Sequence, residues 1–364
     1  MFNPKLLLFL TLVFSGQLAL AHPPGLSSAE ITLGATDIKA TLTFAIQDIE
    51  AFNPMDSDQD AEVTPAEMDA AKPAIAQWVA EQFVLYVDNA VIKTDAVGKV
   101  SFDQQNNAQV QLQFTPSAAQ QLSLESQVLS KLPAGHKQYL TIKNHNGQIL
   151  LEKMLTQEDS HVNLQIPAAN AATASEPQSH TFTDFLALGI EHILTGYDHL
   201  LFLFSLLVVT RSFLPALKII TFFTLAHSIT LGLASFNLVE LPGSVVEPLI
   251  AITIIYVALE NLWRGDNPKG REWLTFFFGL IHGFGFASVL REMNIGASDG
   301  GIMLPLFSFN LGVELGQISV ASIILPLIWW LHKRPAIGSK LTPAGSVLAG
   351  LAGCFWLVER TLLN

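Results

Sequence analysis

The chain has 364 residues, of which half are hydrophobic and only 14% are charged. Its formal net charge of -12 argues against nucleic-acid binding, and its one cysteine excludes an intrachain disulfide framework and any multi-cysteine metal site. The mean hydropathy of +0.40 is high for a soluble protein and indicates the membrane class.

Residues 1–21 have the pattern of a secretory signal peptide. Lys5 precedes a long apolar run, and Ala19-Leu20-Ala21 is a small-x-small cleavage site. We expect cleavage after Ala21, so that the mature chain begins at His22 outside the cytoplasm; the alternative is an uncleaved anchor. A free N-terminal His22 would offer its amine and imidazole to copper, a hypothesis that rests on ligand type alone.

Residues 22–166 alternate short apolar runs with polar residues, which predicts a β-rich, sandwich-like domain. We predict two strands in "ITLGATDIKATLTFAI" and one in "AQVQLQF". Hairpins are predicted in "FVLYVDNAVIKT", turning at Asp88-Asn89, and in "QYLTIKNHNGQILLEKML", turning at Asn146-Gly147. Residues 167–182 are small and polar and predict a linker.

Residues 56–67, "DSDQDAEVTPAE", match the spacing of an EF-hand calcium loop, which supplies oxygen ligands at alternate positions and ends in a glutamate. Ala61 replaces the usual glycine, so we expect modest affinity suited to extracellular Ca²⁺. A helix interrupted at Pro73 is predicted to follow. The alternative is a solvated acidic loop. The predicted ligands are Asp56, Asp58, Asp60, the backbone carbonyl of Glu62, Thr64 and Glu67.

Residues 183–362 contain six apolar segments, each long enough to cross a hydrocarbon layer of about 30 Å. These segments are 183–209, 213–235, 244–263, 272–290, 302–331 and 343–362. Basic residues concentrate in alternate connections, which the positive-inside rule assigns to the cytoplasm. These basic residues are Arg211, Lys218, Arg264, Lys269, Arg271, Lys333, Arg334 and Lys340.

This pattern predicts a membrane α-helical bundle of six transmembrane helices, preceded by the β-rich extracytoplasmic domain. We therefore expect a multi-pass protein of the bacterial inner membrane, with the N-terminal domain and the C-terminus both periplasmic.

The first predicted span, "GIEHILTGYDHLLFL", carries ionisable residues that are costly in hydrocarbon. On a continuous helix, Glu191 and Asp198 share one stripe and His192 and His199 share the next. Later spans add His227, His282 and Glu314 at similar predicted depth. Imidazole with carboxylate is suitable for Ni²⁺, Co²⁺, Zn²⁺ or Fe²⁺. These seven residues are the predicted transition-metal site; the alternative is that each histidine only makes interhelical hydrogen bonds.

The stretch "HILTGYDH" fits the H-x5-DH signature of the HupE/UreJ family of hydrogenase and urease accessory membrane proteins, which are regarded as nickel permeases. The region 183–362 resembles that family, especially its branch with a long extracytoplasmic N-terminal region. The resemblance implies that His192, Asp198 and His199 handle metal. The family's second signature, F-H-G-x-A/V-H-G-x-E, is matched only at His282-Gly283, so the choice among the four metals stays open.

We expect a permease that passes a divalent transition metal inwards across the lipid bilayer, without enzymatic activity. The first alternative is a membrane-embedded zinc-dependent hydrolase in which the same cluster activates water. No H-E-x-x-H motif is present in the sequence. The second alternative is a metal-centre assembly or sensory protein whose β-rich domain docks a periplasmic or metalloenzyme-assembly partner.

Overall fold

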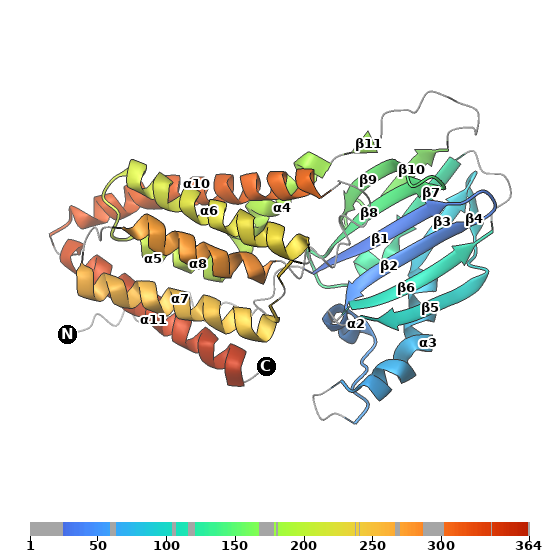
Figure 1. Cartoon of the computed structure of the whole chain (residues 1–364), viewed down its shortest axis with the longest axis horizontal. Helices are drawn as coiled ribbons and strands as arrows, with labels where there is room; N and C mark the ends of the chain where they lie inside the picture. Colours follow the sequence, from blue (N-terminus) through green and yellow to red (C-terminus); the bar gives the residue numbers. More distant parts are fainter. Residues whose placement is uncertain are drawn as a thin grey trace.

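The computed structural model describes residues 25–58, 63–103, 107–115, 121–166, 178–179, 181–236, 238–239, 241–265, 270–286, 302–335 and 337–362. A β-rich domain lies at one end of a bundle of helices, whose axes run roughly along the long axis of the molecule (Figure 1). The predicted signal peptide, His22 and residues 167–177 and 180 of the predicted linker lie outside the described residues. The end of the predicted linker is structured, because Gln178–Ser179 form a strand and a helix begins at Thr181.

The N-terminal domain contains a seven-stranded sheet in the order β11-β9-β8-β1-β2-β6-β5 and a four-stranded sheet in the order β10-β7-β3-β4. Strands β1 and β8 pair in parallel, which joins the first strand of the domain to a strand from its C-terminal half. Strands β1 and β2 are antiparallel. The strands are β1 (Leu26–Leu33), β2 (Ile38–Ala45), β3 (Phe83–Val87), β4 (Ala90–Ile92), β5 (Ala96–Phe102), β6 (Asn107–Phe114), β7 (Gln121–Ser126), β8 (Lys137–Asn144), β9 (Ile149–Leu155), β10 (His161–Gln165) and β11 (Gln178–Ser179).

One apolar core joins the two sheets, as the β-rich, sandwich-like prediction requires. Leu42 and Phe44 of β2 and Leu85 of β3 are fully buried in it. Burying side chains of this kind stabilises the fold by about 1.5–3 kcal/mol each. Both predicted hairpins are confirmed: β3 and β4 turn at Asp88-Asn89, both with positive φ, and β8 and β9 turn at Gly147.

Two α-helices lie on the β domain, α2 (Ile46–Phe52) and α3 (Pro65–Gln82), together with a short 3-10 helix, η1 (Gln127–Ser130). The prediction that Pro73 interrupts the helix after the acidic loop is wrong, because α3 runs unbroken through it. Pro73 lies on the exposed face, where water can solvate the carbonyl that loses its partner. Burial of Ile75 and Val79 just beyond it holds the helix on the sheet.

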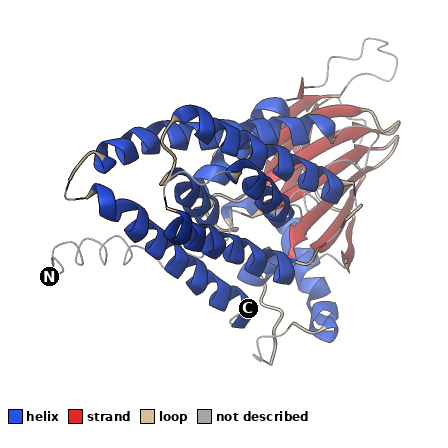
Figure 2. Ribbon diagram, turned by 60° about the vertical axis from the view of Figure 1, so that its left-hand side comes forward, coloured by secondary structure: helices blue, strands red, loops and turns tan. Residues whose placement is uncertain are grey.

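The C-terminal part forms a helical bundle (blue, Figure 2), in which α6, α7, α10 and α11 are each long and apolar enough to cross a membrane. This agrees with four of the predicted spans and with a multi-pass membrane protein. The described part of α8 is shorter, and residues 287–300 lie outside the described residues. The helices are α4 (Thr181–Thr195), α5 (Tyr197–Leu207), α6 (Phe213–Ser235), α7 (Gly243–Arg264), α8 (Arg271–Gly285), α10 (Met303–His332) and α11 (Gly338–Leu362).

The prediction of one continuous helix over 183–209 is wrong, because the chain breaks at Gly196 between α4 and α5. Gly196 is extended, with φ of -75° and ψ of 93°. A Cβ on it would lie 2.7 Å from the His192 carbonyl oxygen and 3.1 Å from Nδ1 of His199. Glycine thus permits a tight corner here, and Glu191 and Asp198 no longer share a stripe.

The carboxyl end of the short helix α5 is held by α7 and α8. Asn261 donates to the carbonyl of Ser205 (2.8 Å), and Arg271 donates to the carbonyl of Leu206 (3.3 Å). Arg271 also pairs with Glu260 at 3.1 Å. The assignment of Arg271 to a basic loop is therefore wrong, because it is the buried first residue of α8. Its guanidinium donates to the Leu206 carbonyl, which the end of α5 leaves without a helical partner.

The β domain is joined to the bundle by a shared apolar cluster. Tyr139 and Met154 of the β domain pack with Phe185 and Leu188 of α4. Polar contacts surround this cluster: the backbone N–H of Met154 donates to Asp184 at 2.9 Å. The β domain therefore fixes the position of α4, the helix that carries His192.

Candidate metal centre

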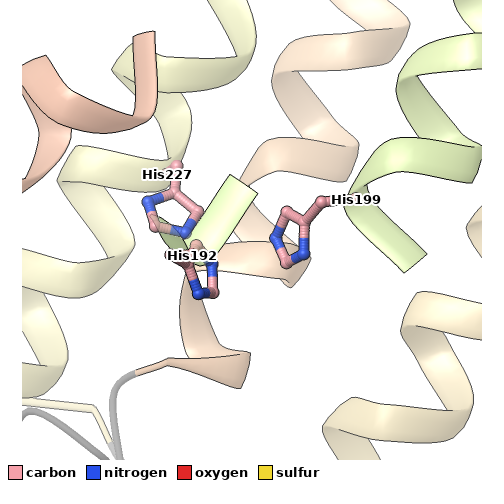
Figure 3. A group of neighbouring side chains, drawn as sticks. All are labelled: His192, His199 and His227. Carbon is pink, nitrogen blue, oxygen red and sulfur yellow. The ribbon is translucent and has the colours of Figure 1, made fainter. Parts of the chain in front are cut away.

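Three histidines from three helices meet inside the bundle: His192 of α4, His199 of α5 and His227 of α6 (Figure 3). One ligand nitrogen from each lies within 4.8 Å of the other two. The rings of His192 and His199 are closest, with centroids 4.6 Å apart. Metal–nitrogen bonds of about 2.0–2.1 Å put ligand nitrogens about 3.3 Å apart around a tetrahedral ion, so small side-chain rotations would close the site.

A fourth histidine, His282 of α8, extends the group. Its ring centroid lies 5.1 Å from that of His199, and the side chain is fully buried. Gly279 and Gly283 on the same helix allow this approach, because α8 lies directly against the backbone of α6. The ring of His282 on α8 thus lies next to the three-histidine group.

Hydrogen bonds fix the proton on two of these rings. Asn310 donates its amide to the carbonyl of Leu306 (2.8 Å), so its oxygen accepts from Nδ1 of His227 at 3.2 Å. Thr253 donates its hydroxyl to the carbonyl of Ile250 (2.7 Å) and therefore accepts from Nε2 of His282 at 2.9 Å. These contacts leave the lone pairs on Nε2 of His227 and on Nδ1 of His282.

Asp198 fixes the third ring. Its Oδ1 accepts from Nδ1 of His199 at 2.9 Å and from the backbone N–H of the same residue at 2.8 Å. The lone pair of His199 therefore lies on Nε2. A carboxylate behind a metal-ligating histidine holds the ring orientation and raises its basicity, and the hydrogen bonds of Asp198 match that arrangement.

The four free nitrogens have no hydrogen-bond partner anywhere in the described part of the chain. They are Nε2 of His192, His199 and His227 and Nδ1 of His282, and all are buried. A buried polar atom left unsatisfied costs about 1–3 kcal/mol. A divalent cation accepts such lone pairs, so this set of donors fits a transition metal.

A sequence model of the family described as HupE / UreJ protein matches residues 168–360, just over half of the chain. The chain belongs to the HupE/UreJ family. No curated protein matches it. The family match covers every helix of the bundle and excludes the β sheets apart from the short strand β11, so family membership concerns the part of the HupE/UreJ protein that carries the histidines.

Aromatic side chains enclose the histidines of this HupE/UreJ protein. Phe286 and Phe309 stack on each other with centroids 4.4 Å apart, and Phe286 lies 4.6 Å from the ring of His192. Phe202 lies 4.7 Å from the ring of His282. Aromatic rings therefore form part of the surroundings of the histidines.

Two predicted carboxylate ligands lie elsewhere. Glu191 pairs with Lys137 of β8 and so belongs to the contact between the β domain and α4. Glu314 of α10 accepts from the hydroxyl of Thr221 at 2.7 Å, and it is not part of the three-histidine group. The prediction placed both residues in the cluster from helical spacing and depth alone, which do not reveal these partners.

Sequence reasoning missed Thr253 and Arg360 as site residues. The guanidinium of Arg360, near the end of α11, lies 3.4 Å from Oδ2 of Asp198. A detectable signal was present, because an arginine inside an apolar helix requires a partner.

The acidic loop brings carboxylate oxygens of Asp56, Asp58 and Glu67 within 4.8 Å of one another. Asp60 and Glu62 lie outside the described residues. Glu67 accepts from the backbone N–H of Ser57 (2.7 Å) and of Thr64 (3.0 Å), and these bonds lower its pKa to about 2. With Thr64 it forms a capping box at the start of α3. Glu67 is therefore ionised and positioned at the loop, as a calcium ligand must be.

Proposed function

We propose that this HupE/UreJ protein is a permease that takes a divalent transition metal as its substrate. The observation that carries the proposal is the approach of three histidines, with one ligand nitrogen of each within 4.8 Å of the other two, inside a bundle of apolar helices. Nitrogens of these three rings and of the neighbouring His282 are buried without a hydrogen-bond partner among the described residues. A structural hydrogen-bonding role does not explain buried imidazole nitrogens that lie close together without a hydrogen-bond partner. Membership of the HupE/UreJ family supports a role in metal handling.

The proposed topology has six crossings, with α4 and α5 together forming one and α8 contributing to another. The end of α11 lies near the β domain, whereas the α7–α8 and α10–α11 connections lie at the far end of the bundle (Figure 1). Arg211, Lys333 and Arg334 lie in connections at this far end, which supports placing it in the cytoplasm. The β domain and the C-terminus are then periplasmic, and the membrane is the bacterial inner membrane.

On this topology the histidines receive metal from the periplasmic half of the bundle. Polar contacts continue between α6 and α10 towards the cytoplasm: Thr224 donates to Gln317 at 3.2 Å, and Thr221 donates to Glu314 at 2.7 Å. We assign Glu314 to a later station on the inward path instead of the resting site. Imidazole ligands suit Ni²⁺, Co²⁺, Zn²⁺ and Fe²⁺, and Ni²⁺ is the first candidate from the family resemblance.

Metal uptake into proteoliposomes that contain the purified protein tests the proposal. His192→Ala, His199→Ala and His227→Ala should each remove most uptake, and double substitutions should add little because the residues act as one unit. His332→Ala is the matched control, since His332 lies on α10 and bonds to Ile328 and Thr342 outside the cluster.

Normal uptake by folded single-histidine variants would refute the permease. A second outcome separates transport from catalysis: protein that binds Zn²⁺ at the histidines yet moves no metal into vesicles would favour the zinc-dependent hydrolase. Bound metal should therefore be counted in the same preparations that are assayed for uptake.

We also propose that the loop 56–67 binds Ca²⁺ in the β domain. The approach of three carboxylates and the ionised state of Glu67 support this proposal. The loop leads into α3, which packs on the core of the β domain, so we give it a structural role in that domain and no part in transport.

A further inference from the structure

Asp198 lies beside the histidines, yet both of its oxygens are engaged away from the free nitrogens. Oδ1 accepts from the ring and the backbone of His199, and Oδ2 faces the guanidinium of Arg360 at 3.4 Å. Asp198 contacts His199 directly, whereas the predicted ligands Glu191 and Glu314 bond to partners elsewhere. Its orientation therefore decides whether the metal meets nitrogen alone or nitrogen with oxygen.

Arg360 is held in place from α7 and from its own helix. It donates to the carbonyl of Glu247 at 3.2 Å, and its Nε lies 3.8 Å from the Glu247 carboxylate. Its guanidinium lies 5.8 Å from the ring centroid of Trp356, one turn earlier on α11. Only 12% of the Arg360 side chain is exposed. An arginine anchored in this way can hold Asp198 in a fixed direction.

We propose that Arg360 is a specificity-determining residue of the metal centre, a role that rests on the proposed transport function. By pairing with Asp198, Arg360 keeps the carboxylate out of the coordination sphere and cancels its charge. The metal then meets imidazole nitrogens only. Imidazole suits Ni²⁺, Co²⁺ and Zn²⁺, whereas carboxylate and water suit Mn²⁺ and Mg²⁺. The pair therefore excludes the harder cations that are abundant in cells.

Loss of Arg360 would change the site in two ways that act together. The Asp198 carboxylate would become free to turn towards the metal and supply an oxygen ligand. Its negative charge would also be uncompensated, which attracts a divalent cation whatever its preferred ligand. The added oxygen ligand favours Mn²⁺ relative to Ni²⁺, whereas the uncompensated charge strengthens the binding of both ions.

The test measures Ni²⁺ and Mn²⁺ dissociation constants for the full-length protein in detergent. Arg360→Gln should reduce the preference for Ni²⁺ over Mn²⁺ by about tenfold or more, whereas Arg360→Lys, which keeps the charge, should largely retain it. Adding Asp198→Asn to Arg360→Gln should restore the preference, since no carboxylate is then present to bind Mn²⁺. Arg334→Gln is the matched control, because Arg334 also lies over a tryptophan, Trp330, and is remote from Asp198.

The outcomes separate this inference from the transport proposal. If Arg360→Gln weakens Ni²⁺ and Mn²⁺ equally and Asp198→Asn restores nothing, Arg360 is only structural and the inference is overturned. If the wild-type protein binds no transition metal, the proposed function fails and the inference fails with it. Should Arg360→Gln not fold, Arg360→Met removes the charge with a side chain better suited to an apolar helix and gives the same comparison.

Discussion

The close contact of α8 with α6 at Gly283 makes the metal centre sensitive to one methyl group. A Cβ on Gly283 would lie 2.7 Å from the carbonyl oxygen of His227 and 2.9 Å from Cβ of Thr230. Ordinary contacts begin at 3.4 Å, so Gly283→Ala requires the two helices to separate locally by about 0.7 Å. Because the neighbour is backbone, no side-chain rotation can relieve this clash.

The displacement acts on two ligands at once, since His282 precedes Gly283 and His227 carries the opposing carbonyl. A binding constellation tolerates about 0.5 Å of misplacement, which is less than the shift required. Overpacking of this kind costs about 1–3 kcal/mol of stability. We expect Gly283→Ala to bind Ni²⁺ at least roughly tenfold more weakly, a loss of about 1.4 kcal/mol.

Isothermal titration of Ni²⁺ and thermal melting of the detergent-solubilised protein measure both effects. Gly232→Ala is the matched control. Gly232 is a helical glycine like Gly283 but lies on α6, and nothing lies within 4 Å of its added Cβ. It should bind Ni²⁺ normally and melt no earlier, given the better helix propensity of alanine. Wild-type Ni²⁺ affinity in a folded Gly283→Ala variant would show that the position of His227 against α8 does not matter for binding.

Three further predictions concern residues outside the four rings. Asn310→Leu should weaken Ni²⁺ binding by about 10–100-fold, because the proton of His227 is then no longer held on Nδ1. An unchanged dissociation constant would refute the role of this hydrogen bond. Glu67→Gln should abolish a Ca²⁺-dependent rise in melting temperature that the wild type shows; a wild type without any such rise would make the loop an ordinary acidic surface. Burial raises the pKa of Asp48 to about 6 and lowers the pKa of His136 to about 4. Protonated Asp48 therefore contributes about 3 kcal/mol to the free energy of unfolding, and this contribution is lost as pH rises from about 4 through 6. The contribution of neutral His136 to the same free energy is lost as pH falls from about 6.5 through 4. These slopes oppose each other in the wild type, so Asp48→Asn should melt earlier as pH falls from 6.5 to 4, whereas a flat profile would contradict the assignment.

Local features of the fold were predictable because neighbouring residues determine them. The turns at Asp88-Asn89 and Asn146-Gly147 need positive φ, which asparagine, aspartate and glycine adopt most readily, and both turns are present. The spans of α6, α7, α10 and α11 follow from length and apolar composition. Neither inference requires knowledge of what the segment packs against.

The break at Gly196 was not predictable in the same way. Isolated glycines are common in membrane helices, so Gly196 alone gave no signal. The corner is stabilised by tertiary contacts: Asp198 at the start of α5 bonds to His199 and to Arg360, 162 residues away. Assuming a continuous helix placed Glu191 beside Asp198, and the true partner of Glu191 is Lys137 of a distant strand.

The structure brings His192, His199 and His227 together, as the sequence predicts, while their supporting residues were not predicted. Residue type identifies a metal ligand, because an ionisable group in hydrocarbon requires a reason. A supporting residue such as Thr253 is an ordinary side chain of an apolar helix, and only its 2.9 Å contact with His282 distinguishes it. The sequence therefore predicted donor atoms better than it predicted what orients them.

The distribution of these supports over the bundle has a mechanical consequence. The four rings come from α4, α5, α6 and α8, while Thr253, Asn310 and Arg360 support them from α7, α10 and α11. Every described helix of the bundle thus contributes a ligand or holds one. The proposed permease must release its substrate as well as bind it, and a tilt of any one helix would remove an imidazole from the group or free a ring to rotate. On that proposal, we expect small helix movements to switch the site from holding metal to passing it inwards.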